Sequence, residues 1–540
     1  MAASRGFPRT PLKGDVFSRC SEGRDTMSET IRKLSVVDSA FLFAETAECP
    51  MHVGSLTIVK LPDGYDGDFY EDFKARIASR LDLAKSLRWK LASTPFDIDR
   101  PSWVEDEQFD LDRHVLRGAL PEPHDRVVAE RIAGWLHAKT LNRARPLWEL
   151  YVFDGMPDNE AAIYSKMHHA LIDGGAGAAL TEILYETSAT PAPDTTAAAA
   201  PARVSGPSKK QDVRDVASSM FAAYAELWRA PFQSSQLGNL ELPRSGGSDL
   251  ASVLLDAAIH SVEWPLRIAA NYGEIATAYQ AAITNAFKPE SVKALDLLSA
   301  PSTPLNVAIS SERSFAGVTV SMARVKAIAA KAGGKVNDVV LELASGLLRR
   351  YLVEEEALPK KSLTAFVPIS AREKGDAELK NQVSGMVVPL ATDLDDPKKR
   401  LEAIVAGAAT AKELANPFRS LMPHFADIPT FGSPMLLQLL AVFYGRSQLA
   451  NSIPPAMNVV VSNVFFSRTP IYIAGAQILH VYPMSIPVHG QALNITVHGY
   501  VDGLDFGLMA AANVVPDVQR LTKLLTAELD DLERAYGTAA

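Results

Sequence analysis

Two adjacent histidines are the residues of this chain best suited to chemistry. They lie in the stretch KMHHALIDGGAGAAL, where His168 and His169 are followed by Asp173 and a run of glycines. Histidine titrates near neutral pH, so it can take a proton from a hydroxyl that attacks a carbonyl and return that proton to the leaving group. The residue types allow three interpretations: a metal site, acid/base catalysis, or an ordinary strand-to-helix turn with structural histidines.

A metal site fits the spacing poorly. Adjacent residues of a strand point to opposite faces, so one ion would struggle to collect both imidazoles. The chain has no helical H-E-x-x-H arrangement, no cysteine near the pair and no G-x-S-x-G turn that would present a serine nucleophile. The sequence therefore predicts no metal site and no covalent nucleophile here, which leaves a general base or a structural role.

The composition limits the other function classes. The chain has 540 residues, of which 47% are hydrophobic, and its formal net charge is -9. It is long enough for more than one domain, and it lacks the basic field that draws proteins to nucleic acid. The only cysteines are Cys20 and Cys49, too few for a disulfide framework, which fits a reducing interior. We therefore expect a soluble globular protein with no nucleic-acid partner.

The hydropathy of the sequence predicts neither a membrane-spanning helix nor a secretion signal. Residues 1–26 are polar and turn-forming without an apolar core segment, so we expect a disordered extension, and Met27 is an alternative start. The longest strongly apolar stretch, PMLLQLLAVFYG at 434–445, is well short of the roughly 20 residues of a spanning helix. It is typical of a core helix, although it would also suit contact with a lipid surface.

Composition shifts divide the chain into two α/β halves. Residues 188–210 are rich in Ala, Pro, Thr and Ser and predict a flexible linker. Before it, MHVGSLTIVKL, LWELYVFDG and AAIYSKMHH predict strands, whereas DGDFYEDFKARIASRLDLA and HDRVVAERIAGWLHAKTLN have helical periodicity. About 80 residues of helical pattern follow the linker.

The second half begins near residue 305. It has strand-like SLTAFVPIS, QVSGMVVPLATDL, AMNVVVSNVFF and QILHVYPMSI, then a hairpin predicted to turn at Asp502-Gly503. A last amphipathic helix is predicted to open at Pro516 and to bury Val518, Leu521, Leu525, Leu529 and Leu532.

The motifs together resemble one family. HHALIDG matches the H-H-x-x-x-D-G motif of the CoA-dependent acyltransferase superfamily, which includes chloramphenicol acetyltransferase and peptide-synthetase condensation domains. LSVVDSAFLFAETAECPMHVGSL, RPLWELYVFDG, VNDVVLELASGLLRRYL and VVVSNVFFSRTPIYIAGA then follow in the order of the bacterial wax ester synthase/diacylglycerol acyltransferase family. The chain is similar to this family from about Leu34 to Leu532.

The resemblance implies a fold and a domain organisation. We expect an α/β protein with two chloramphenicol-acetyltransferase-like domains, joined by crossover helices, with a substrate tunnel at their interface. The implied segments are an extension at 1–26, an N-terminal domain at 27–187, a linker at 188–210, crossover helices at 211–300 and a C-terminal domain at 301–536.

It also implies a reaction and a role for each motif residue. By similarity His169 is the general base that deprotonates an alcohol for direct attack on the thioester of acyl-CoA, while His168 supports the loop and Asp173 orients it. Gly174 belongs to the substrate-binding turn. Acyl-CoA enters as a co-substrate, and no further cofactor is implied.

Three further residues match motifs of the family. Asn337 matches the family's N-D motif and either contributes to the active centre or N-caps the helix that follows the Gly333-Gly334 break. Ser462 and Asn463 match the family's S-N-V segment and are expected to line the tunnel. The usual Pro-Gly after that segment is replaced here by Phe465-Phe466. The P-L-W motif, which ends at Trp148, is expected to serve packing.

The expected acceptor is diacylglycerol, a long-chain fatty alcohol or both, giving triacylglycerol or wax ester. The expected location is the cytoplasm, peripherally attached to the membrane or to lipid droplets. Two alternatives stay open at this point: a transferase fed by a carrier protein, as in condensation domains, and a non-catalytic lipid-surface binding protein.

Overall fold

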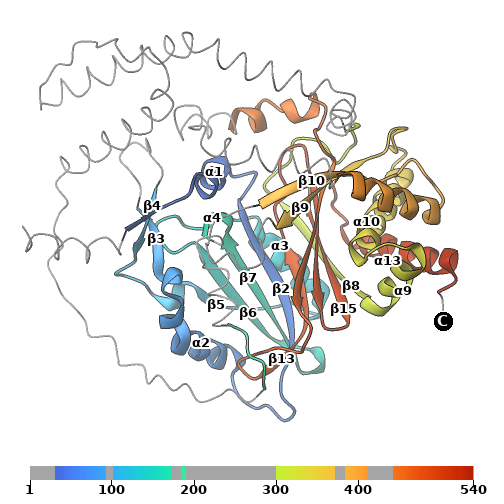
Figure 1. The fold of residues 1–540 in the computed structure, drawn as a ribbon. Coiled ribbons are helices and arrows are strands. Elements are labelled where there is room, and N and C mark those ends of the chain that lie inside the picture. The colour runs from blue at the N-terminus through green and yellow to red at the C-terminus, as the bar shows by residue number, and fades with distance from the viewer. Residues whose placement is uncertain are drawn as a thin grey trace, which may run out of the picture.

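Two six-stranded sheets form the frame of the molecule (Figure 1). The computed structural model describes residues 31–92, 101–171, 184–189, 300–370, 383–411 and 442–538. The prediction of an α/β protein with two sheet-containing domains is confirmed. The crossover region at 211–300 and nearly all of the predicted linker lie outside the described residues.

The first sheet has the strand order β12-β13-β2-β7-β6-β5. Its strands are β2 (His52–Lys60), β5 (Val115–Gly118), β6 (Trp148–Met156), β7 (Glu160–His168), β12 (Tyr472–Ile473) and β13 (Ala476–Met484). All neighbours are antiparallel except β5 and β6. Because β12 and β13 come from the second half of the chain, the first sheet is completed only when both halves are folded together.

The second sheet has the order β10-β9-β11-β14-β15-β8. Its strands are β8 (Arg313–Ser321), β9 (Thr364–Ser370), β10 (Val383–Pro389), β11 (Val459–Ser467), β14 (Leu493–Tyr500) and β15 (Gly503–Ala511). The predicted β14–β15 hairpin is present, but Tyr500 pairs with Gly503, so its loop is Val501-Asp502, one residue earlier than expected. Val501 adopts the left-handed conformation that lets the chain reverse there.

Three helices cover the outer face of the second sheet: α9 (Met322–Ala332), α10 (Val336–Glu354) and α13 (Gln519–Tyr536) (Figure 1). The predicted leucine stripe of α13, from Leu521 to Leu532, is fully buried. The helix begins at Gln519 rather than at Pro516, and Val518 occupies its N-cap position without a side-chain hydrogen bond. Helical periodicity therefore identified the buried face correctly and misplaced only the start.

The first sheet carries α2 (Phe69–Arg80) on one face and α3 (Arg126–His137) on the other. Helix α3 also packs against β8 of the second sheet, so its buried face lies between the two sheets. The remaining elements are short: β1 (Ile31–Lys33), α1 (Val36–Ala44), η1 (Leu81–Arg88), β3 (Trp89–Ala92), β4 (Ser102–Glu105), η3 (Leu111–Arg113), η4 (Pro157–Asn159), α4 (His169–Leu171) and η7 (Leu449–Asn451).

The described helices include none that combines the length and the apolar character needed to cross a membrane. Most of the apolar stretch at 434–445 lies outside the described residues. Its last residues are described, and Phe443 among them is 61% exposed.

Candidate active site

The histidine pair lies where the central strand of the first sheet ends. His168 is the last residue of β7 and pairs with His52 of β2, and His169 opens the short helix α4. The backbone N–H of His169 donates to the carbonyl of Met51, at 2.9 Å. The pair is therefore fixed between two neighbouring strands, whereas Asp173 and Gly174 lie outside the described residues.

His168 is buried, with 1% of its surface exposed, and both of its ring nitrogens face other groups. Its Nδ1 accepts the backbone N–H of Ala170 at 3.1 Å. A nitrogen that accepts a hydrogen bond carries no proton, so in this arrangement the proton of the neutral ring is on Nε2. That nitrogen lies 3.2 Å from Oε2 of Glu45. His168 consequently has no free lone pair to offer a substrate.

Glu45 follows the last residue of α1 and is buried beside His168. Its carboxylate also accepts the N–H of Met51 at 3.1 Å and Nη2 of Arg143 at 2.9 Å. Burial alone would raise the pKa of Glu45, but the contacts with His168, Arg143 and the Met51 N–H outweigh burial and lower the pKa to about 2. Glu45 is therefore ionised at neutral pH.

His169 has a different environment from its neighbour. Its ring stacks on Phe41 of α1, with centroids 3.9 Å apart and an angle of 14° between the planes. Its Nδ1 is buried, and no described group forms a hydrogen bond with it. Burial, and next the adjacent His168, lower the pKa of His169 to about 4. The ring is thus neutral at pH 7, which is the form that can accept a proton from a hydroxyl.

The second-half residues selected from the sequence meet one another. Asn463 of β11 donates from Nδ2 to Oδ1 of Asn337, at 3.3 Å, and Ser462 precedes Asn463 on the same strand. The interpretation of Asn337 as an N-cap is wrong. Lys335 is the N-cap of α10, and its N–H donates to the side chain of Asp338 at 2.7 Å. Among the described residues, neither Asn337 nor Asn463 forms a hydrogen bond with the histidine pair.

The remaining motif residues are placed as follows. Leu147 and Trp148 are fully buried, and the indole N–H of Trp148 donates to the carbonyl of Leu87 at 2.7 Å, which supports a packing role. At the end of β11, Phe465 is 61% exposed, whereas Phe466 stacks on His498 with ring centroids 5.4 Å apart. The two phenylalanines therefore form an aromatic strand end in place of a Pro-Gly turn.

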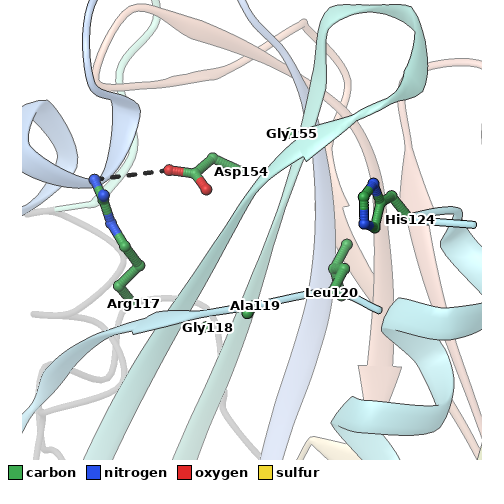
Figure 2. A pocket seen from close by; sticks show the side chains of 7 residues that line it. All are labelled: Arg117, Gly118, Ala119, Leu120, His124, Asp154 and Gly155. Carbon is green, nitrogen blue, oxygen red and sulfur yellow. Dashed lines mark ion pairs between the residues drawn. The ribbon is translucent and has the colours of Figure 1, made fainter. Parts of the chain in front are cut away.

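A pocket of about 460 Å³ lies beside the carboxyl ends of β5 and β6 (Figure 2). Because β7 runs antiparallel to β6, this is the end of the first sheet opposite to His168. Its lining includes Arg117 and Gly118 of β5, His124, and Asp154 of β6, whose carboxylate is 3.7 Å from the guanidinium of Arg117. None of the selected site residues lines it. In the described part of the chain, no three His, Cys, Asp or Glu side chains gather in a way that would hold a metal ion.

Sequence reasoning missed the groups that surround the pair: Phe41, Glu45, Met51 and Arg143. Phe41, Glu45 and Met51 stand inside the N-terminal stretch that resembles the family, yet no local pattern assigns them a role. The signal in that stretch was an acidic residue directly after an apolar helix. A buried carboxylate needs a partner, and that partner is contributed by strand β7.

Comparison with known proteins identifies the family of the chain. The model of the wax ester synthase/diacylglycerol acyltransferase catalytic domain matches residues 34–340, and the model of the C-terminal domain of the same family matches residues 379–533. The probable diacylglycerol O-acyltransferase tgs2 of Mycobacterium tuberculosis is 33% identical over 503 residues, which cover 93% of this chain and 98% of that protein. The O-acyltransferase WSD of Acinetobacter baylyi is 31% identical over 515 residues, covering 93% and 97%.

A solved structure shows the same likeness. The wax ester synthase/diacylglycerol acyltransferase from Marinobacter aquaeolei superposes with a TM-score of 0.61 at 25% identity, covering 94% of this chain and all of that one. The two family models cover parts of both α/β halves, and His168 and His169 lie within the catalytic-domain match. The chain belongs to the wax ester synthase/diacylglycerol acyltransferase family and is an acyltransferase.

Proposed function

We propose that the protein transfers an acyl group from acyl-CoA to the hydroxyl of a lipid alcohol. The acceptor is diacylglycerol, a long-chain fatty alcohol or both, so the product is triacylglycerol, wax ester or both. Family membership and the names of the relatives support this reaction class. Acyl-CoA is a co-substrate in this scheme, and no metal or other cofactor takes part in it.

In the proposed mechanism, a free ring nitrogen of His169 accepts the proton of the acceptor hydroxyl. The hydroxyl oxygen attacks the thioester carbonyl directly and forms the new C–O bond. The C–S bond then breaks, and the proton held by His169 passes to the sulfur of the departing CoA. The bonds and charges balance without a covalent acyl-enzyme, so both substrates must be bound together, in a tunnel between the two domains.

One observation carries the choice of base. Nδ1 of His168 accepts the Ala170 N–H and its Nε2 lies 3.2 Å from the Glu45 carboxylate, so neither nitrogen offers a lone pair to a substrate, whereas the ring of His169 stacks on Phe41. The low pKa of His169 also favours the neutral ring that a base requires.

The test is replacement of His169 by Ala, with His124→Asn as the matched control. His124 lines the pocket at the far end of the sheet, and Asn tolerates its left-handed backbone. Loss of a general base costs about 10²- to 10⁴-fold in rate. We expect His169→Ala to lose kcat on that order with an unchanged melting temperature, and the control to keep it. Near-normal turnover by folded His169→Ala at saturating substrates would refute the proposal.

The remaining residues receive supporting roles. Asp173 orients the loop that follows the pair, and Gly174 permits its sharp turn beside the substrate. By similarity to the family's motifs, Ser462, Asn463 and Asn337 line the second-half side of the tunnel, and Asn463 of β11 donates to Asn337 of α10. A competition assay with one labelled acyl-CoA and mixed acceptors, separating triacylglycerol from wax ester, identifies the acceptor.

Peripheral attachment to the cytoplasmic membrane surface or to lipid droplets completes the proposal, because both acceptors are insoluble in water. The alternatives, transfer from a carrier protein and non-catalytic lipid binding, are separated by two measurements. Release of free CoA that requires the alcohol favours the acyltransferase. Activity only with a carrier-bound acyl group would favour the first alternative, and acyl-CoA binding without CoA release would favour the second.

A further inference from the structure

The mechanism assigns no role to the buried, ionised carboxylate of Glu45, which lies beside the histidine pair. It is 7% exposed, and its three partners come from three separate segments: Met51 before β2, Arg143 after α3, and His168 at the end of β7. A buried carboxylate is costly unless hydrogen bonds and opposite charges compensate it. These three contacts keep the carboxylate ionised beside the histidine pair.

Two routes lead from Glu45 to the backbone that carries His169. Along the first, Glu45 accepts the N–H of Met51, and the carbonyl of Met51 accepts the N–H of His169 at 2.9 Å. Along the second, Glu45 lies 3.2 Å from Nε2 of His168, and Nδ1 of His168 accepts the N–H of Ala170 at 3.1 Å. Both routes end on consecutive amides at the start of α4, where helical N–H groups lack partners within the helix.

The second route depends on the tautomer of His168. Only an imidazole with its proton on Nε2 has a lone pair on Nδ1 for the Ala170 N–H. A carboxylate beside Nε2 selects this tautomer, because it accepts a proton and repels a lone pair. Without the negative charge the other tautomer becomes accessible, and Nδ1–H would then face the Ala170 N–H, donor against donor.

The ring of His169 is held by the same helix. Phe41, one turn before Glu45 on α1, stacks on the imidazole. It packs with a buried cluster drawn from both halves of the chain, whose members are Cys49, Met51, Ile309, Ala492 and Ala511. Helix α1 thus fixes the backbone of His169 through Glu45 and its ring through Phe41.

We propose that Glu45 is a positioning residue for the acyl transfer. It holds His168 in the Nε2–H tautomer and, through His168 and Met51, holds the first turn of α4 so that His169 meets the acceptor hydroxyl. This inference rests on the proposed role of His169 as the base. Glu45 itself touches neither substrate.

The first measurement compares Glu45→Gln with the control Glu48→Gln, which removes the same charge three residues away. A displacement of about 1 Å at a reacting group can cost on the order of 10²-fold in rate. We expect Glu45→Gln to lower kcat about 10- to 100-fold and to leave the KM for acyl-CoA within about twofold, since binding groups are unchanged. Glu48→Gln should keep the kcat of the parent protein.

The second measurement tests whether Glu45 acts through His168. Residues that act through one contact have non-additive effects, so Glu45→Gln should slow a His168→Ala variant by less than about threefold. An effect of the same size in both backgrounds would overturn the proposed route through His168. Nitrogen NMR of ring-labelled histidine should show one Nε2–H tautomer for His168 in the parent and a tautomer mixture in Glu45→Gln.

Glu45→Asp provides the same test if Glu45→Gln fails to fold. Aspartate keeps the charge beside Arg143 but is shorter by one methylene, so we expect a folded protein with a kcat reduced about 10-fold or more. Full kcat in a folded Glu45 variant overturns the positioning role while His169→Ala remains inactive. Near-normal turnover by His169→Ala overturns the proposed function itself, so the two failures are distinguishable.

Discussion

Acidification from pH 7.5 to pH 5.5 should leave kcat/KM almost unchanged, although histidine is the proposed base. Burial, followed by the neighbouring His168, lowers the pKa of His169 to about 4. A base works only while it is deprotonated, and kcat/KM reports the pKa of the free enzyme. With a pKa of about 4, roughly 97% of His169 is neutral at pH 5.5, whereas an ordinary histidine with a pKa of about 6.5 would be roughly 9% neutral. The ratio of kcat/KM between the two pH values is therefore expected near 1 rather than near 0.1.

The assay should follow labelled ester by lipid separation, because thiol reagents depend on the thiolate and lose sensitivity in acid. The phosphate of CoA also changes its charge near pH 6. A parallel series with an acyl-pantetheine thioester, which carries no phosphate, removes that contribution. Aliquots returned to pH 7.5 before assay show whether the enzyme has stayed folded.

A roughly tenfold loss of kcat/KM between pH 7.5 and pH 5.5, with the pantetheine donor and with full recovery on return, would refute this reasoning. It would mean that the base titrates like an exposed histidine. The group that takes the proton would then not be His169, whose ring is largely buried, stacks on Phe41 and lies next to His168.

Two further predictions concern stability. His52 and His137 are buried, and burial lowers the pKa of both imidazoles, that of His137 to about 3. In the unfolded chain both titrate near pH 6.5. Between that pH and the lowered pKa of each folded-state histidine, only the unfolded chain binds the proton. The free energy of unfolding should therefore fall as the pH falls through this window, by about 1.4 kcal/mol per pH unit for each histidine. Equal urea midpoints at pH 7 and pH 5 would contradict this prediction. Arg400→Met should lower the free energy of unfolding by about 3–5 kcal/mol, because Arg400 is the buried guanidinium between Glu342 and Glu528; a loss below about 1 kcal/mol in urea titrations would count against that interpretation.

Local patterns determined the secondary structure and the faces of its elements. The alternation in AAIYSKMHH places Ile163 and Met167 on one face and Tyr164 on the other, and the structure buries them in different cores. The leucines of α13 follow helical spacing and are buried together. These features are predictable because a strand repeats every two residues and a helix every 3.6, whatever the chain packs against.

Local sequence patterns did not determine which strands pair with one another. The pattern of QILHVYPMSI predicts a strand, but β13 pairs with β2 of the first sheet rather than with its sequence neighbours in the second. An alternating strand presents the same hydrogen-bonding edge to any partner, so the sheet that it joins depends on how the two halves pack. Helix α10 likewise begins at Val336 with Lys335, rather than Asn337, as its N-cap, and the side chain of Asn337 is bonded instead to Asn463, which is distant in the sequence.

The candidate site divides in the same way. The H-H-x-x-x-D-G motif brought His168 and His169 to attention from the sequence alone, because the two residues are adjacent and the motif is short. Only the tertiary structure distinguished their environments. The Glu45 carboxylate faces His168, and the Phe41 ring stacks on His169. Both residues belong to α1 and its C-cap, more than 120 positions before the histidines in the sequence. Burial and neighbouring charges set a pKa, and both are properties of the packed chain rather than of the residue type.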